Sequence, residues 1–179
     1  MLVTLRPWTP DDAAALLAAR AGDPELDKQF GGSGPRTLEE HEAFIVAEMC
    51  VDPTSQVSLA IDVDGRAVGN VGVGAIEPRH NTGWMHYWTA VEARGAGLAS
   101  RACASLARYA FEHLGVHRLE LGHRVNNPAS CRVAHRAGFA AEGLERHKLR
   151  YGTERFDVET HARLATDPDP DLAPIPILL

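Results

Sequence analysis

The sequence predicts a single mixed α/β (α+β) domain, in which helices flank one mostly antiparallel sheet. Three observations support this prediction. Short segments that alternate apolar and polar residues recur along the chain, segments with a helical apolar stripe stand between them, and turns rich in glycine or proline separate the two. With 179 residues, of which 45% are hydrophobic, the chain can bury a core and is too apolar to be disordered. We expect one domain over residues 1–166 and an extended tail over residues 167–179.

Charge and cysteine content exclude several classes of protein. The net charge of −6 argues against a protein that coats nucleic acid, and no run approaches the roughly 20 apolar residues of a membrane helix. The first residues lack the basic segment of a signal peptide. Cys50, Cys103 and Cys131 are odd in number and widely spaced, so they predict neither a disulfide framework nor a zinc knuckle. We therefore expect a reduced, cytoplasmic protein with no nucleic-acid, membrane or metal partner.

The first third of the chain combines one strand with two helices. Residues 2–8 alternate as a strand does, and Thr9-Pro10-Asp11-Asp12 then supplies an N-cap, a proline and two acids for a helix that runs to about Ala21. Glycines and a proline make residues 30–36 a loop. The capping box over residues 37–40 opens a helix that we expect to reach about Val51.

In the middle of the chain, apolar residues recur at every second position, as they do in strands. A strand is expected over residues 57–63, and Asp64-Gly65 is a strong hairpin turn. The return strand, residues 67–76, shifts its apolar phase at Gly69-Asn70, which predicts a bulge there. Another strand is expected over residues 83–91. Later elements follow the same signals: a helix over 97–114, a strand over 117–125, a helix over 127–137 closed by Gly138, and strands over 139–145 and 156–164. Four prolines exclude regular structure from the tail and predict an extended or mobile segment.

The segment from Val91 to Ser100 is the first candidate for chemistry. It is rich in small residues and lies between a strand and an amphipathic helix, so its backbone amides can approach an anion at the positive end of that helix. Arg94 adds a charge suited to phosphate. The missing Gly-Lys-Ser/Thr excludes a P-loop, and the glycine spacing disfavours a dinucleotide fold. The alternative is a glycine-rich turn with a solvated arginine.

The segment from Asn126 to Ser130 is the second candidate. Asn126 lies where a strand gives way to a helix, and Ser130 lies one turn into that helix. Taken alone, these residues are best explained as a helix cap and as polar side chains exposed to solvent.

Taken together, residues 83–143 resemble the GNAT superfamily of acetyl-CoA-dependent N-acetyltransferases, most closely its RimJ/RimL branch. The resemblance is carried by Tyr87-Trp88, Arg94-Gly95-Ala96-Gly97-Leu98-Ala99, Asn126-Asn127-Pro128-Ala129-Ser130, Ala137-Gly138-Phe139 and Glu142-Gly143. It implies a sheet whose central strand pair is splayed, and an acetyl-CoA cosubstrate. In such proteins the coenzyme pyrophosphate lies on the glycine-rich turn and the pantetheine arm pairs with the preceding strand. The implied coenzyme contacts are Trp88, Thr89, Ala90, Val91, Arg94, Gly95, Ala96, Gly97, Leu98, Ala99, Ser100, Asn126 and Ser130.

The resemblance also implies direct acyl transfer, with Ser130 protonating the departing thiolate. The chain departs from the family at the general base, because Trp84 and His86 stand where relatives carry Glu and Gly, and Leu149 stands where close relatives carry another Glu. His86 and Glu77 are the candidate bases, since imidazole has a suitable pKa and Glu77 ends a strand near the expected cleft. A structural histidine and deprotonation through water are the alternatives, and Glu142 is a further family position that can be structural.

The resemblance therefore predicts an enzyme that moves the acetyl group of acetyl-CoA to a primary amine. The acceptor is a protein N-terminal α-amine or a small-molecule amine, and a homodimer is left open. The competing hypothesis is a domain that binds or senses acyl-CoA without turnover. The intact Ser130 and coenzyme turn favour the enzyme, and the missing family glutamates favour the binding domain.

Overall fold

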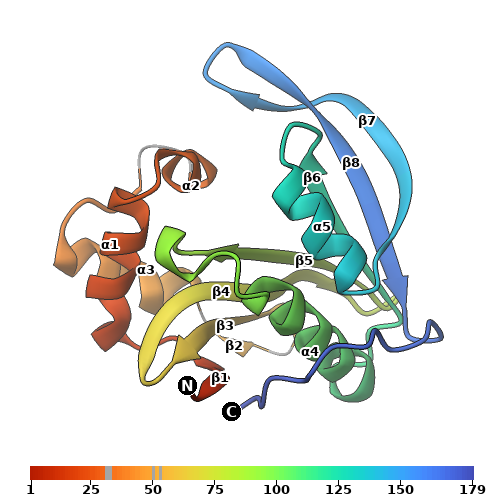
Figure 1. The fold of residues 1–179 in the computed structure, drawn as a ribbon, viewed down its shortest axis with the longest axis horizontal. Coiled ribbons are helices and arrows are strands. Elements are labelled where there is room, and N and C mark those ends of the chain that lie inside the picture. Colours follow the sequence, from red (N-terminus) through yellow and green to blue (C-terminus); the bar gives the residue numbers. More distant parts are fainter. Residues whose placement is uncertain (31–33, 50, 53) are drawn as a thin grey trace.

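The computed structural model describes residues 1–30, 34–49, 51–52 and 54–179, with Val51 described by its backbone alone. One mixed sheet has helices on both faces (Figure 1), and its strand order is β1-β3-β4-β5-β6-β8-β7, with the short β2 paired to β3. The strands are β1 (Val3–Pro7), β2 (Val51–Asp52), β3 (Gln56–Val63), β4 (Arg66–Glu77), β5 (Thr82–Thr89), β6 (Arg118–Arg124), β7 (Ala140–Tyr151) and β8 (Glu154–Leu164). The helices are η1 (Pro10–Asp12), α1 (Ala13–Ala21), α2 (Pro24–Gln29), α3 (Leu38–Glu48), η2 (Val91–Ala93), α4 (Leu98–His113) and α5 (Pro128–Arg136).

The β3–β4 hairpin lies between β1 and β5 in the sheet. Its turn is Asp64-Gly65, as expected, and both residues have positive φ. The register passes from Ile61 opposite Gly69 to Asp62 opposite Ala67, so Val68 is the extra residue of a bulge. The predicted bulge is thus present one residue before Gly69-Asn70.

The two faces of the hairpin bury different helices. Alternating residues of β3, such as Leu59 and Ile61, belong to the larger core that also contains Leu106 of α4. Ala60 points to the opposite face and belongs to a second core with Leu16 of α1. Because side chains alternate along a strand, one apolar strand can supply both cores.

The predicted splay of the central strands is confirmed. β5 and β6 run parallel, and their ladder extends only from Thr82–Arg118 to Trp84–Glu120. Beyond Trp84, β5 pairs only with β4, whereas β6 continues against β8. The two central strands therefore diverge toward their carboxyl ends, and the predicted fold class is confirmed.

Several element boundaries differ from the prediction. The helix expected to reach Val51 ends at Glu48, because β2 forms at Val51–Asp52 and pairs with β3. The strand expected to reach Val91 ends at Thr89, because the 3₁₀ helix η2 begins at Val91 and leads into the glycine-rich turn. The last hairpin extends beyond the predicted strands, since β7 reaches Tyr151 and β8 begins at Glu154. Residues 31–33 of the expected loop and Cys50 lie outside the described residues.

Helix α2 is not in the sequence prediction. Its N-cap is Asp23, whose carboxylate accepts a hydrogen bond from the Glu25 amide at 3.0 Å, and Pro24 follows at the first helical position. The sequence Asp-Pro-Glu is a clear helix start. With only six residues, the helix is too short to show an apolar period, which is why the pattern does not reveal it.

The tail over residues 167–179 is extended and packs on the domain. The Leu5 amide donates to the carbonyl oxygen of Pro176 at 2.8 Å, and the Leu178 amide donates to the carbonyl oxygen of Leu5 at 2.8 Å. Ile175 is 2% exposed, and its amide donates to Ser105 Oγ of α4. Figure 1 shows the tail passing α4 and ending near the N-terminus.

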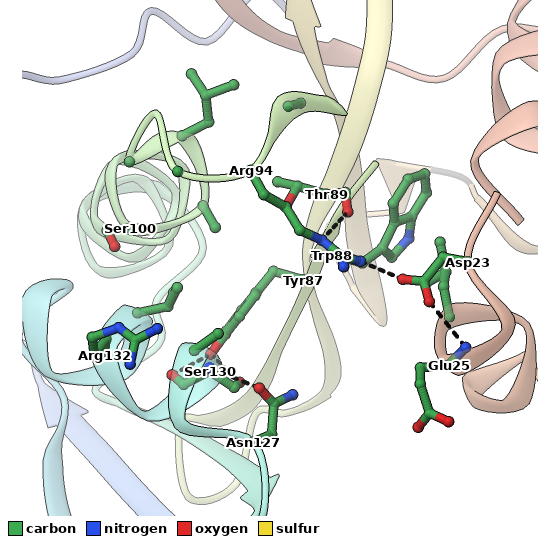
Figure 2. Close-up of a pocket in the computed structure, with 18 of the residues that line it drawn as sticks. Asp23, Glu25, Tyr87, Trp88, Thr89, Arg94, Ser100, Asn127, Ser130 and Arg132 are labelled. Carbon is green, nitrogen blue, oxygen red and sulfur yellow. Dashed lines mark hydrogen bonds and ion pairs between the residues drawn. The ribbon is translucent and has the colours of Figure 1, made fainter. Parts of the chain in front are cut away.

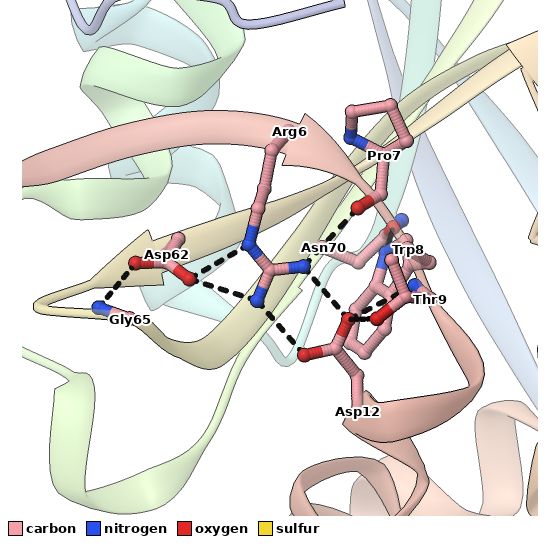
Figure 3. A network of polar contacts seen from close by, with 8 residues as sticks. All are labelled: Arg6, Pro7, Trp8, Thr9, Asp12, Asp62, Gly65 and Asn70. Atoms are coloured by element: carbon pink, nitrogen blue, oxygen red, sulfur yellow. Dashed lines mark hydrogen bonds and ion pairs between the residues drawn. The ribbon is translucent and has the colours of Figure 1, made fainter.

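A charged network fastens β1 to the first helical turn and to β3 (Figure 3). Arg6 donates to both carboxylate oxygens of Asp12, at 2.7 and 2.8 Å, and its Nε donates to Asp62 at 2.8 Å. Trp8 Nε1 donates to Asn70 Oδ1 beside this network.

No helix among the described residues has the length and apolar character needed to cross a bilayer.

Candidate active site

The divergence of β5 from β6 opens a cavity of about 620 Å³. Its walls come from β5, the glycine-rich turn, the first turn of α4, helix α5 and helix α2 (Figure 2). Most of the expected coenzyme contacts line it: Trp88, Thr89, Arg94, Gly95, Gly97, Leu98, Ala99, Ser100, Asn126 and Ser130. Ala90, Val91 and Ala96 do not, so the structure brings together both motifs but not every residue of them.

The start of α4 is built to receive an anion. Gly95 and Gly97 have positive φ, of 83° and 73°, so the turn has a shape that other residues adopt only with strain. No side chain caps α4 and no acid lies in its first turn. The first amides of the helix therefore face the cavity with their partial positive charge uncompensated by any described side chain.

Two arginines of α5 strengthen this positive site. A Cβ built on Gly97 would lie 4.0 Å from both terminal nitrogens of Arg136, which places that guanidinium beside the start of α4. Arg132 lines the same cavity. Neither forms an ion pair with a described residue. The sequence prediction did not include these arginines, although their spacing of four residues on one helix was a readable signal.

Arg94 is directed differently from the expectation that it faces phosphate. Its guanidinium forms an ion pair with Asp23, the N-cap of α2, and its Nε donates to the carbonyl oxygen of Thr89 at 3.3 Å (Figure 2). Burial raises the pKa of Asp23, but the hydrogen bonds from Arg94 and from the α2 amides outweigh this, and the pKa lies below its usual value. The carboxylate is thus fully charged at neutral pH.

Helix α2 forms the wall of the cavity that faces α5, and a second ion pair joins it to β6. Glu25 accepts from Arg124 of β6 at 2.9 Å, so α2 contacts both the glycine-rich turn and the strand across the gap. The sequence prediction did not include these two ion pairs, because it did not include helix α2.

Only part of the β5 backbone faces the gap. The Ala90 amide donates to the carbonyl oxygen of Val68 on β4, at 2.8 Å. Because successive residues of a strand direct their amides and carbonyls to opposite neighbours, the polar groups of Trp88 also face β4, and those of Tyr87 and Thr89 face the gap. The backbone groups that can bind an extended ligand thus belong to Tyr87 and to the amide of Thr89, since the Thr89 carbonyl oxygen already accepts from Arg94.

Ser130 is held in a hydrogen-bonded pair with Tyr87 at the cavity wall. The two hydroxyl oxygens lie 2.7 Å apart, and Tyr87 Oη also donates to the carbonyl oxygen of Ser130 at 3.0 Å. The Tyr87 hydroxyl has only one proton, which it donates to the Ser130 carbonyl. The Ser130 hydroxyl then donates to Tyr87 Oη, so both contacts are hydrogen bonds. Burial raises the pKa of Tyr87 well above its usual range, so the phenol stays protonated. Asn127, and not Asn126, caps α5 by accepting from the Ser130 amide at 3.1 Å.

Neither candidate base lies beside Ser130. His86 alternates with Tyr87 on β5 and therefore lies on the opposite face, where its ring covers Gly72. The surrounding protein disfavours the imidazolium and lowers the pKa of His86. Glu77 ends β4, and its carboxylate accepts from the backbone amides of Arg79 and His80 at 2.9 and 2.8 Å. Neither side chain lines the cavity.

Comparisons with known proteins agree with this geometry. The chain is 34% identical over 86 residues to the putative ribosomal N-acetyltransferase YdaF of Bacillus subtilis, covering 48% of this chain and 47% of that protein. It is 30% identical to the ribosomal-protein-serine acetyltransferase of Escherichia coli, over 54% of each chain. The chain thus spans about half the length of these curated relatives.

A solved structure extends the likeness over most of the fold. Mycobacterium smegmatis RimJ, in complex with CoA-disulfide, superposes with a TM-score of 0.78 at 25% sequence identity, covering 91% of this chain and 82% of that one. A family model described as an acetyltransferase (GNAT) domain matches residues 3–140, which include the glycine-rich turn, Tyr87 and Ser130. The chain therefore belongs to the acetyltransferase (GNAT) domain family.

Proposed function

We propose that the protein transfers the acetyl group of acetyl-CoA directly to a primary amine. The observation that carries the proposal is one cavity that holds both an anion site and a proton donor. The free amides of α4, with Arg132 and Arg136, suit the coenzyme phosphates, and the polar backbone of Tyr87 and Thr89 suits its amide-containing arm. Family membership supports the same assignment.

The chemistry uses few groups. The neutral amine attacks the thioester carbonyl, the C–N bond forms, the C–S bond breaks, and the sulfur leaves as a thiolate. The Ser130 hydroxyl turns from Tyr87 toward the sulfur and gives the thiolate a proton. The Tyr87 hydroxyl then turns from the Ser130 carbonyl and donates to Ser130 Oγ, 2.7 Å away. The amine proton passes to a base outside the cavity through water. His86 is the first candidate, since its lowered pKa leaves it neutral at pH 7, and Glu77 is the second.

The acceptor we propose is a protein N-terminal α-amine, because the relatives above are named for ribosomal proteins. The same naming supports a place of action in the cytoplasm. A small-molecule amine is the alternative acceptor. We expect the protein to be a homodimer or a monomer, which sedimentation of the full chain distinguishes.

One observation favours a second function, the binding of an acyl-CoA without turnover. Among the described residues that line the cavity there is no histidine, and both carboxylates, Asp23 and Glu25, are paired with arginines. A domain with a coenzyme site and no base would sense the coenzyme without consuming it.

Release of free CoA decides between the two functions. Acetyl-CoA would be incubated with the protein and with peptides bearing free N-termini, polyamines or amino acids, and the thiol would be measured over time. An acceptor-dependent release that Ser130→Ala lowers supports the enzyme. Stabilisation of the fold by acetyl-CoA without any release supports the binding domain. If acetyl-CoA neither binds nor is consumed, both proposals are wrong.

A further inference from the structure

Four side chains with metal-binding atoms converge outside the cavity, among β6, β8 and α5. They are His123 of β6, Cys131 of α5, and Glu159 and His161 of β8, and their potential ligand atoms all lie within 4.8 Å of one another. β6 and β8 are antiparallel neighbours, with His123 directly opposite Glu159. None of the four lines the coenzyme cavity, so the cluster is a separate feature of the fold.

Four of the six separations between these atoms are close to the edges of a small tetrahedron. His123 Nε2 and His161 Nε2 lie 3.0 Å apart, and they lie 3.2 and 3.1 Å from Glu159 Oε2. Cys131 Sγ lies 3.6 Å from the same oxygen. A tetrahedral Zn²⁺ with bonds of about 2.0–2.3 Å holds its ligand atoms roughly 3.3–3.6 Å apart. The separations from Cys131 Sγ to the two histidine nitrogens are at most 4.8 Å, so a rotation of the Cys131 side chain toward the histidines would let the four atoms enclose one ion.

The two histidines are oriented as ligands are. Their side chains are 3% and 0% exposed. His123 Nδ1 lies 3.1 Å from the carbonyl oxygen of Arg124, and since a carbonyl only accepts, Nδ1 carries the proton. The lone pair of His123 Nε2 is then directed at the cluster, which is the arrangement that fixes a metal-binding tautomer.

Hydrogen bonding alone accounts for the cluster less well. His161 Nε2 faces two acceptors, the lone pair of His123 and the Glu159 carboxylate, with one proton to offer. A cation would instead use the lone pairs of both imidazoles and the charge of Glu159 together. Glu159 and Cys131 are partly exposed, so an ion has a route in from the surface.

We propose that His123 Nε2, Cys131 Sγ, Glu159 Oε2 and His161 Nε2 form a four-coordinate Zn²⁺ site. The donor set of nitrogen, sulfur and oxygen is typical of zinc, and four protein ligands leave no open position, which is typical of a structural site. Binding displaces the thiol proton of Cys131 to solvent. The ion joins α5 to the two strands beneath it, and α5 carries Ser130 and the two cavity arginines. The site does not depend on the function proposed above.

The test uses the full chain, freed of any affinity tag and of metal by a chelator. Co²⁺ is added first, because its visible absorption reports coordination and a thiolate ligand adds a near-ultraviolet charge-transfer band. We expect saturation at one equivalent with the intense visible bands of four-coordinate Co²⁺, displacement by Zn²⁺, and a higher melting temperature with Zn²⁺.

Two variants and two controls locate the ligands. Cys131→Ser should abolish the charge-transfer band, and His161→Gln should weaken Zn²⁺ binding at least about 100-fold, since even indirect partners of a metal cost 10- to 100-fold. His135→Gln is the matched control, because His135 packs its ring against His161 at 5.1 Å without belonging to the cluster. Cys103→Ala removes the other described free cysteine.

Circular dichroism of each metal-free variant verifies the fold, and His123→Gln replaces any variant that fails to fold. Substoichiometric binding, or a Co²⁺ spectrum that Cys131→Ser leaves unchanged, overturns the proposal.

Discussion

At the scale of single residues, the hydroxyl pair formed by Tyr87 and Ser130 is the feature closest to the proposed chemistry. Ser130→Ala removes the group that protonates the thiolate, so we expect kcat to fall about 10- to 10³-fold with little change in coenzyme affinity. Tyr87→Phe keeps Ser130 but removes its partner at 2.7 Å, so we expect a smaller fall in kcat, about tenfold.

Steady-state kinetics and coenzyme titration test both variants. Tyr109→Phe is the control, because Tyr109 packs against His113 on α4 and does not line the cavity. Equal losses of coenzyme affinity and of rate in the Ser130 variant would instead assign Ser130 to packing.

Arg136 and Arg94 carry the same charge but have different surroundings. Arg136 lies beside the start of α4, whereas the guanidinium of Arg94 is paired with Asp23. We expect Arg136→Gln to weaken CoA binding about 10- to 100-fold, the range of a hydrogen bond to a charged group, and Arg94→Gln to weaken it less.

Isothermal titration with CoA measures this difference between the two arginines. Arg101→Gln serves as the control, since Arg101 bonds to the tail at the carbonyl oxygen of Ala173. A larger effect at Arg94 than at Arg136 would restore Arg94 as the main phosphate contact.

At the scale of elements, the hairpin and the coenzyme turn could be predicted from the sequence, whereas helix α2 offered only the signal of its first turn. The Asp64-Gly65 turn and the glycines before α4 are local signals, because they impose positive φ on a few adjacent residues. The convergence of Ser130 with Tyr87, or of His123 with His161, depends instead on which strands pair. Such contacts between distant segments follow from strand register, which no local pattern contains.

The ion pairs of α2 give this element a testable role. Asp23→Asn keeps an N-cap residue for α2 but removes the charge that holds Arg94. We expect the global stability to change by less than about 1 kcal/mol, because Arg94 is half-exposed, and the amides of α2 to exchange hydrogen faster.

Hydrogen exchange followed by mass spectrometry measures the effect on α2. Glu92→Gln, which breaks an exposed pair with Arg66 away from α2, is the matched control. Unchanged exchange of α2 in the Asp23 variant would show that the pair with Arg94 does not hold the helix.

At the scale of the whole molecule, the C-terminal tail contributes to the core of the domain. Ile175 is 2% exposed and packs in the same cluster as Leu5 and Leu106. We expect Ile175→Ala to lower the free energy of unfolding by about 2–4 kcal/mol, as for other buried aliphatic truncations. Leu179→Ala, at a position 61% exposed, should change it by less than about 0.5 kcal/mol. Urea denaturation measures both, and equal effects would mean that the tail does not pack in solution.

The network of Arg6 makes the stability of the molecule depend on pH. Burial raises the pKa of Asp12, but the hydrogen bonds from Arg6 and from the Thr9 amide outweigh it, and the pKa lies below its usual value. A carboxyl whose pKa is depressed on folding stabilises the protein above the pKa of the unfolded chain, about 4, and loses this contribution as the pH falls through the folded value. The native protein should therefore lose this contribution to its stability as the pH falls below about 5.

In the Arg6→Met variant, we expect the stability contributed by the Arg6 network to depend on pH in the opposite direction. Without the guanidinium, Asp12 and Asp62 remain as two buried carboxylates, so at pH 7 we expect a loss of about 2–4 kcal/mol. Burial then raises the pKa of Asp12 in the folded state. Protonation of Asp12 at lower pH therefore reduces the destabilisation of the variant, whereas it weakens the network of the native protein. The difference in unfolding free energy between the two proteins should therefore narrow from pH 7 to pH 4. Urea denaturation at each pH measures it, with Arg66→Met at an exposed pair as the control. A difference that stays constant with pH would show that Arg6 acts through packing, because only a charge interaction with Asp12 ties the contribution of Arg6 to the protonation of that carboxylate.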